Sequence, residues 1–204
     1  MTLYAGNEGN AKPFKVHTDF ACHYSPVFKA FNSDFIEGQS QEYRLDVDEE
    51  EVVRLLVEWF YTQALNTRQP DEKLDDAATM EEDLILAKLW VLADKLLLPQ
   101  MQNQVLDRVQ EIRDAAGRIP TECLHYIYNN TPPGSPLRRW YVYECASWLD
   151  RNWLADHTDQ LPHEMLIELT IFFCSYVNDL PNSPLADLRN LHSVAYFHVK
   201  IPDN

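Results

Sequence analysis

The stretch F-K-V-H-T-D-F-A-C-H-Y-S-P-V-F-K-A-F-N-S-D-F at residues 14–35 decides the fold when it is read with two later segments. These are E-W-F-Y-T at residues 58–62 and A-K-L-W-V-L-A-D-K-L-L-L-P at residues 87–99. The first stretch begins as a β-favouring run and continues as two short helical pieces that separate near Ser25-Pro26. Ser25 is predicted to cap the second piece, with Pro26 at its first helical position.

Strand and helix signals alternate through the first half of the chain. Residues 1–4 and 14–16 predict a hairpin, and residues 42–47 alternate polar and apolar as a half-buried strand does. Residues 52–61 predict a buried helix. The polar, acidic residues 66–82 predict an exposed loop, and residues 83–98 predict a second buried helix. Later, an apolar stripe over residues 100–113 predicts a helix that Gly117 ends.

From Pro120 onward the strand signals cease. Four helices are predicted in this part, over residues 121–128, from Ser135-Pro136 to about Trp153, from Leu161-Pro162, and from Ser183-Pro184. The pattern predicts an α+β domain over residues 1–117 and an all-α extension over residues 118–204. Trp59, Trp90 and Trp148 are predicted to be core residues, and the position of Trp140 stays open.

Charge and composition exclude several classes of partner. The chain has 204 residues and a net charge of -15, so its surface repels nucleic-acid phosphates and anionic lipid heads. We therefore expect neither nucleic-acid nor membrane binding. No apolar run reaches the ~18 residues that a membrane span needs. The first residues do not read as a secretory signal, which predicts a cytoplasmic or nuclear protein with reduced thiols.

The residues that could carry chemistry do not form a recognisable set. Cys22 lies near His17 and Asp19, which would suit a thiol nucleophile, but sequence neighbours on one short helix seldom converge in a cleft. The alternative, Cys22 as a small core residue, is favoured. The cysteine spacing gives no zinc ligand pair, and no phosphate-binding glycine motif occurs. We expect no catalytic residue, metal or cofactor.

Taken together, the segments resemble a BTB/POZ domain, most closely the divergent form abundant in filamentous fungi. Phe14-Lys15-Val16-His17 resembles the family's second strand and the His that follows it. Ser25-Pro26-Val27-Phe28 resembles the S-x-x-F helix start, and Ala93-Asp94-Lys95 resembles the A-D-K of a later helix. The resemblance covers about residues 1–115 and implies a small β-sheet capped by a helical cluster. Residues 128–140 resemble the helical tail of fungal BTB proteins, where some relatives have a BACK-like segment.

The resemblance implies a protein–protein interaction module without catalysis of its own. The leading expectation is a substrate adaptor for a cullin-RING ubiquitin ligase, with a cullin as partner. The alternative is a homo-oligomerisation or scaffold domain of a transcriptional or regulatory complex. A homodimer mate is the second expected partner. Many animal BTB domains dimerise by swapping a first helix, and this chain starts directly at a strand, so a dimer would need another route.

The predicted protein-binding residues are Phe28, Phe31, Met80 and Glu82. In the family's cullin adaptors an apolar-x-acidic motif precedes the A-D-K helix, and Met80-Glu81-Glu82 fits it literally. The family's spacing instead points to residues 85–87, which contain no acid. The acids of residues 66–83 leave two readings open, a loop that captures a basic partner segment and a solvated insertion.

Overall fold

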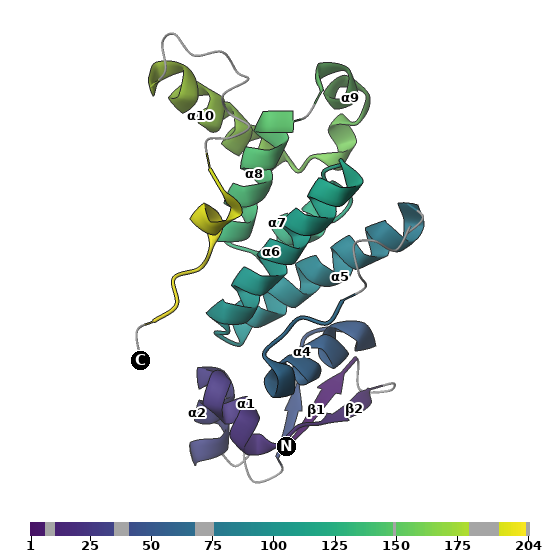
Figure 1. Cartoon of the computed structure of the whole chain (residues 1–204), viewed down its shortest axis with the longest axis vertical. Coiled ribbons are helices and arrows are strands. Elements are labelled where there is room, and N and C mark those ends of the chain that lie inside the picture. Colours follow the sequence, from purple (N-terminus) through teal and green to yellow (C-terminus); the bar gives the residue numbers. More distant parts are fainter. Residues whose placement is uncertain (7–10, 35–40, 68–75, 149, 180–191, 203–204) are drawn as a thin grey trace. The chain divides into compact units, whose positions relative to one another are not determined.

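The computed structural model describes residues 1–6, 11–34, 41–67, 76–148, 150–179 and 192–202 (Figure 1). The chain divides into two compact units, Met1–Val105 with Lys200–Asn204, and Leu106–Val199. A small sheet and several helices form the first unit, and the described part of the second unit has helices without strands. The predicted fold class, an α+β fold with a helical extension, is confirmed.

The sheet of the first unit has three short strands in the order β2-β1-β3. β1 (Thr2–Ala5) pairs antiparallel with β2 (Lys12–Lys15) and parallel with β3 (Glu42–Arg44). Leu3 lies opposite both Phe14 and Tyr43 and is fully buried. The alternation of buried and half-buried residues along β1 shows that one face of the sheet covers the core.

Two helices follow the hairpin, α1 (Thr18–Tyr24) and α2 (Pro26–Asp34). The predicted break and cap are both confirmed. The hydroxyl of Ser25 accepts the backbone N–H of Phe28 at 3.2 Å and donates to the carbonyl oxygen of Leu96 at 2.8 Å. Pro26 has no N–H to lose at the first helical position, so the second helix can begin there.

The longer helices of the first unit are α4 (Glu50–Thr62), α5 (Asp76–Lys95) and the start of α6 (Pro99–Ala116). Trp59 and Trp90 are each 1% exposed, which confirms their prediction as core residues. The indole N–H of Trp59 donates to the side-chain oxygen of Gln104 at 2.8 Å. Such a bond allows the large ring to be buried while its N–H donor keeps a hydrogen-bond partner.

The loop predicted over residues 66–82 is wrong for its second part. α5 begins at Asp76, so the predicted helix start at residue 83 lies two turns too late. The segment A-A-T-M-E-E at residues 77–82 has one large apolar residue but contains strong helix formers, and its helical faces are unequally buried. The low content of large apolar residues therefore did not indicate a loop here. Residues 68–75, with Asp71, Glu72 and Asp75, lie outside the described residues.

The second unit contains α7 (Leu124–Asn130), α8 (Pro136–Trp148), α9 (Arg151–Asp156) and α10 (His163–Asp179). The 3-10 turns η1 (Thr158–Gln160) and η3 (Val194–Phe197) complete its described part. In Figure 1 the η3 segment lies beside α8, in agreement with the packing between them. The helix predicted from Ser183-Pro184 falls outside the described residues.

The single helix predicted from residue 136 to residue 153 is wrong. α8 ends at Trp148, and the carboxylate of Asp150 caps α9 by accepting the backbone N–H groups of Asn152 (2.7 Å) and Trp153 (3.3 Å). The prediction of Trp148 as core is also wrong, because 41% of it is exposed. Trp140, whose position the sequence left open, is fully buried.

A buried arginine holds the turn between α7 and α8. The guanidinium of Arg138 donates to the hydroxyl of Thr131 at 2.9 Å, to the carbonyl oxygen of Tyr128 at 2.6 Å and to the carbonyl oxygen of Thr131. The hydroxyl of Tyr128 in turn donates to the carboxylate of Glu168 at 2.6 Å. Burial and this carboxylate raise the pKa of Tyr128 above its usual range. The cluster connects α7, α8 and α10.

Candidate protein-docking surfaces

A groove of about 510 Å³ lies in the first unit between α4 and the start of α5. The buried side chains of Leu55 and Leu86 form part of its lining. Three of its lining residues are acidic, Glu51, Glu81 and Glu82. The remaining lining residues are Arg54, Asn66, Thr67 and Ile85. A lining that combines apolar and acidic side chains is suited to a partner side chain that has an apolar stem and a polar end.

The positive charge at this groove is already compensated. Arg54 donates to Glu51 at 2.7 and 2.8 Å and to Glu58 at 2.6 Å. Its hydrogen bond with Glu51 holds the pKa of the Arg54 guanidinium above its usual range. With Arg54 held by two carboxylates, the groove keeps an acidic character.

The structure places the predicted contacts Met80 and Glu82 on α5, and only Glu82 lines the groove. Met80 is 38% exposed, whereas Glu82 is 7% exposed. Glu82 lies in this groove because α5 starts earlier than the sequence indicated. The two residues therefore share one helix but present very different areas to a partner.

Phe28 and Phe31 also differ in how much of each side chain is exposed. Phe28 has no exposed surface, and its ring packs edge-on against Tyr43 at 5.0 Å and beside Phe60 at 6.0 Å. Phe31 is half-buried, and its ring packs edge-on against that of Tyr43 at 5.1 Å. As the chain is folded, Phe31 can touch a partner directly, and Phe28 supports the surface from below.

An exposed aromatic cluster in the first unit was not predicted. It consists of His17, Phe20 and Tyr61. The Phe20 and Tyr61 rings are 5.2 Å apart, and His17 lies edge-on to both at 6.0 and 5.8 Å. Phe20 is 43% and Tyr61 44% exposed. Exposed, mutually supported aromatic side chains are typical anchors of protein interfaces.

A sequence signal for Tyr61 was present. The buried residues of α4 follow helical spacing, at Val52, Leu56, Trp59 and Phe60. Tyr61 is one residue beyond Phe60, which turns it ~100° away from that face. A large aromatic residue on the solvent side of an amphipathic helix could therefore have been singled out. Its contact with Phe20, by contrast, joins distant parts of the sequence.

The thiol that was considered as a nucleophile has the wrong environment for that role. The Cys22 thiol donates to the carbonyl oxygen of Phe28 at 3.5 Å. Burial, and secondarily Asp19, raises the pKa of Cys22. A nucleophilic cysteine needs the opposite shift.

Among the described residues, no group of three or more His, Cys, Asp or Glu side chains is arranged to hold a metal ion, and no helix has the length and apolarity to span a bilayer.

Comparison with protein families decides the class. The profile of the BTB/POZ domain matches residues 1–112, which is more than half of the chain. The chain belongs to the BTB/POZ family. No curated protein and no solved structure matches it. BTB domains are protein–protein interaction modules, so the surfaces of the first unit are the relevant site, and binding rather than catalysis is the function that the family supports.

Proposed function

We propose that this chain is an adaptor that docks onto a cullin scaffold of a ubiquitin ligase through its BTB unit. The observation that carries the proposal is the exposed cluster of His17, Phe20 and Tyr61 on a domain of the BTB family. Phe20 and Tyr61 cost less to bury in an interface than flexible side chains, because two torsion angles fix each ring. Their exposed rings are suited to a pocket on a partner.

The residues predicted from the sequence are proposed as further contacts. Phe31 and Met80 are exposed enough to touch a partner, and Glu82 would bind through the wall of the α4–α5 groove. Phe28 would act by supporting Phe31 through Tyr43. The acidic side chains at the groove would set the specificity and the association rate more than the affinity.

A pull-down with a purified cullin N-terminal region tests the proposal. We expect wild-type chain to be retained, and Tyr61→Ala, Phe31→Ala and Met80→Ala to reduce retention. Ser33→Ala, on an exposed residue of α2, is the matched control and should bind normally. Failure of the wild-type chain to bind any cullin N-terminal region would contradict the adaptor proposal.

The second candidate is a homo-oligomerisation domain. Within the residues that the structure describes, the sheet ends at β2 on one side and β3 on the other. The residues of β2 are largely exposed, and an edge strand can pair with a strand of another copy. Light scattering at increasing concentration distinguishes the candidates, because a chain that stays monomeric would contradict oligomerisation and leave the adaptor proposal standing.

The domain division is part of the same proposal. We assign residues 1–117 to the BTB domain and residues 118–204 to a BACK-like helical extension. The family match ends at residue 112, close to the end of α6. The compact units divide earlier, between Val105 and Leu106, within α6. Limited proteolysis tests the boundary. If the BTB domain ends at residue 117, we expect a protected fragment that retains all of α6.

A further inference from the structure

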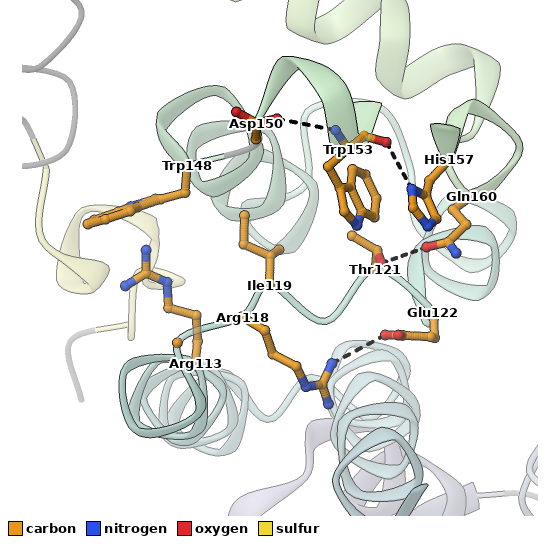
Figure 2. A pocket seen from close by; sticks show the side chains of 11 residues that line it. Arg113, Arg118, Ile119, Thr121, Glu122, Trp148, Asp150, Trp153, His157 and Gln160 are labelled. Carbon is orange, nitrogen blue, oxygen red and sulfur yellow. Dashed lines mark hydrogen bonds and ion pairs between the residues drawn. The ribbon is translucent and has the colours of Figure 1, made fainter. Parts of the chain in front are cut away.

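A cleft of the second unit and the α4–α5 groove of the first unit have similar volumes but differ in their balance of charge. The cleft measures about 500 Å³, and Figure 2 shows Trp148 and Trp153 on opposite sides of it. The arginines that line it are paired with acids, Arg113 with Asp114 and Glu144, and Arg118 with Glu122. With its arginines compensated, the cleft favours neither an anionic nor a cationic ligand.

The α4–α5 groove has an excess of acidic side chains. Glu51, Glu81 and Glu82 line it, and Arg54 is the basic side chain among its described lining residues. Arg54 forms ion pairs with Glu51 at 2.7 Å and with Glu58 at 2.6 Å, so two carboxylates share its charge. The charge of Arg54 is therefore balanced without Glu81 or Glu82, and the groove keeps a net negative charge.

The acidic character extends beyond the lining of the groove. Residues 46–83, which include α4 and the start of α5, contain 13 acidic and 3 basic residues, so they supply a net charge of -10 to the chain's total of -15. Lysines from outside this stretch pair with acids within it, Lys12 with Glu50, Lys88 with Glu49, and Lys95 with Asp46. Counting these pairs still leaves seven more acidic than basic groups. A region of this charge attracts basic partners and raises their association rate.

Each acid of the groove lies one helical turn before an aliphatic side chain of the same groove. The pairs are Glu51 with Leu55 on α4, and Glu81 with Ile85 and Glu82 with Leu86 on α5. Residues four apart share a helix face, with ~5–6 Å between their Cβ atoms. The four-carbon stem of lysine can span such a spacing. The lining therefore matches a side chain with an aliphatic stem and a cationic end, as Lys and Arg have.

Glu81 and Ile85 are accessible to a partner. Glu81 is exposed and Ile85 is half-buried, whereas Leu55 and Leu86 are buried behind them. Among the described residues, no hydrogen bond or ion pair engages the carboxylate of Glu81. A cation that binds there therefore displaces no existing partner of this carboxylate.

We infer that the α4–α5 groove binds a basic segment of a partner protein. One Lys or Arg of the segment places its stem against Ile85 and Leu86 and its cation at Glu81. A metal ion is a poorer match, because within the described residues no group of three or more His, Cys, Asp or Glu side chains is arranged to hold one. The inference rests on the proposed docking role of the BTB unit and specifies the chemistry of the partner.

Fluorescence polarisation with the full chain and three labelled peptides of equal length tests the inference. The first peptide alternates Lys and Ser, and the second replaces Lys by Glu. The third replaces Lys by 2,4-diaminobutyrate, which keeps the positive charge on a stem two methylenes shorter. We expect the first to bind at least about tenfold more tightly than the second, which corresponds to ~1.4 kcal/mol. It should bind at least about threefold more tightly than the third, because buried methylenes add affinity. Smaller differences, or no binding of the first peptide, would overturn the inference.

Variants localise the binding. Glu81→Lys should weaken binding of the Lys peptide about tenfold or more, and Ile85→Ser about threefold or more. The matched controls are Asp156→Lys, at an exposed acid of α9, and Ile171→Ser, at an apolar residue that is 60% exposed on α10. Both should bind like wild type. Glu81→Lys and Asp156→Lys change the net charge equally, so equal losses would show unspecific attraction to the acidic chain and would overturn the site.

Two further measurements keep the result interpretable. Thermal unfolding of each variant reports whether it is folded, and if Ile85→Ser lowers the midpoint, the comparison of Glu81→Lys with Asp156→Lys decides. Tyr61→Ala should leave the affinity for the Lys peptide unchanged while it lowers cullin retention. A chain that binds the Lys peptide in the groove but no cullin would contradict the adaptor proposal alone, so the two failures give different results.

Discussion

The hydroxyl of Tyr61 accepts the backbone N–H of His17 at 2.9 Å and lies 3.0 Å from the Nδ1 of the same residue. This pair joins the end of α4 to the residue before α1, 44 positions away in the sequence. It fixes the ring of Tyr61 beside that of Phe20 and so orients the proposed anchor cluster.

The Tyr61 ring and hydroxyl should have separable roles. Tyr61→Phe keeps the ring and removes the hydroxyl, so we expect a loss of about 1 kcal/mol or less in the free energy of unfolding, because the bond is exposed to water. Its cullin retention should stay close to that of wild type. Tyr61→Ala removes the ring and should lose retention. Urea unfolding and the pull-down, applied to both variants, check this, and equal binding by both would contradict an anchoring role for the ring.

Phe28 and Phe31 should respond in opposite ways. Phe28→Ala should destabilise the chain by roughly 3–5 kcal/mol, since it empties a fully buried site among aromatic rings. Phe31→Ala should cost clearly less, because Phe31 is only half-buried, and should affect binding instead. Urea unfolding measures the first effect and the pull-down the second. A mild effect of Phe28→Ala on stability would show that the side chain is not part of the core.

Local sequence rules predicted much of this fold. The break between α1 and α2 was predictable because Ser25 and Pro26 act on their immediate neighbours, and the core positions of α4 followed from helical spacing. The start of α5 was missed because Met80 is the only large apolar residue among residues 77–82, so no hydrophobic periodicity revealed their helix propensity. The N-cap at Asp150, which ends the continuity of α8 and α9, uses a residue type that signals a helix start and could have been found.

The sites were less predictable for a physical reason. Tyr61 and Phe20, like Trp148 and Trp153, gain their arrangement from packing between separate elements, and periodicity describes only one element at a time. The exposure of Trp148 depends on the end of α8 and on the contact with Arg113, which is 35 residues earlier in the sequence. Sequence reasoning predicted a docking module through its family motifs, and the structure supplied the accessible surfaces.

Ser25 should contribute to stability beyond an ordinary cap. Ser25→Ala removes the acceptor for the Phe28 N–H and leaves the buried carbonyl oxygen of Leu96 without this donor. We expect a loss of about 1–3 kcal/mol, from the cap and the buried acceptor together. Ser33→Ala is the matched control, since the Ser33 hydroxyl bonds the Ala30 carbonyl oxygen on the surface and should change stability by less than ~0.5 kcal/mol. Similar effects of the two substitutions would show that the buried bonds of Ser25 add little to stability.

The neighbouring arginines Arg138 and Arg139 offer a stringent comparison. Arg138→Met should destabilise the chain by roughly 3–5 kcal/mol, because it removes the donors of two buried carbonyl oxygens and the partner of Glu168. Arg139→Met, at an exposed residue, should change stability by less than ~0.5 kcal/mol. Urea unfolding of the two variants measures the difference. A stable Arg138→Met variant would mean that the apolar side chain replaces the buried network without loss.

Glu144 should give the chain a distinctive dependence of stability on pH. Burial raises its pKa above the usual 4.5, and Arg113 opposes the shift only in part. The folded chain therefore holds this proton at pH values where the unfolded chain has released it. The contribution of Glu144 to stability is then largest at low pH and falls as the pH rises through the folded-state pKa. Glu144→Gln lacks this titration. The difference in unfolding free energy, wild type minus Glu144→Gln, should decrease as the pH is raised from 4.5 toward neutrality, and a difference that increases over the same interval would show that the ion pair with Arg113 outweighs burial.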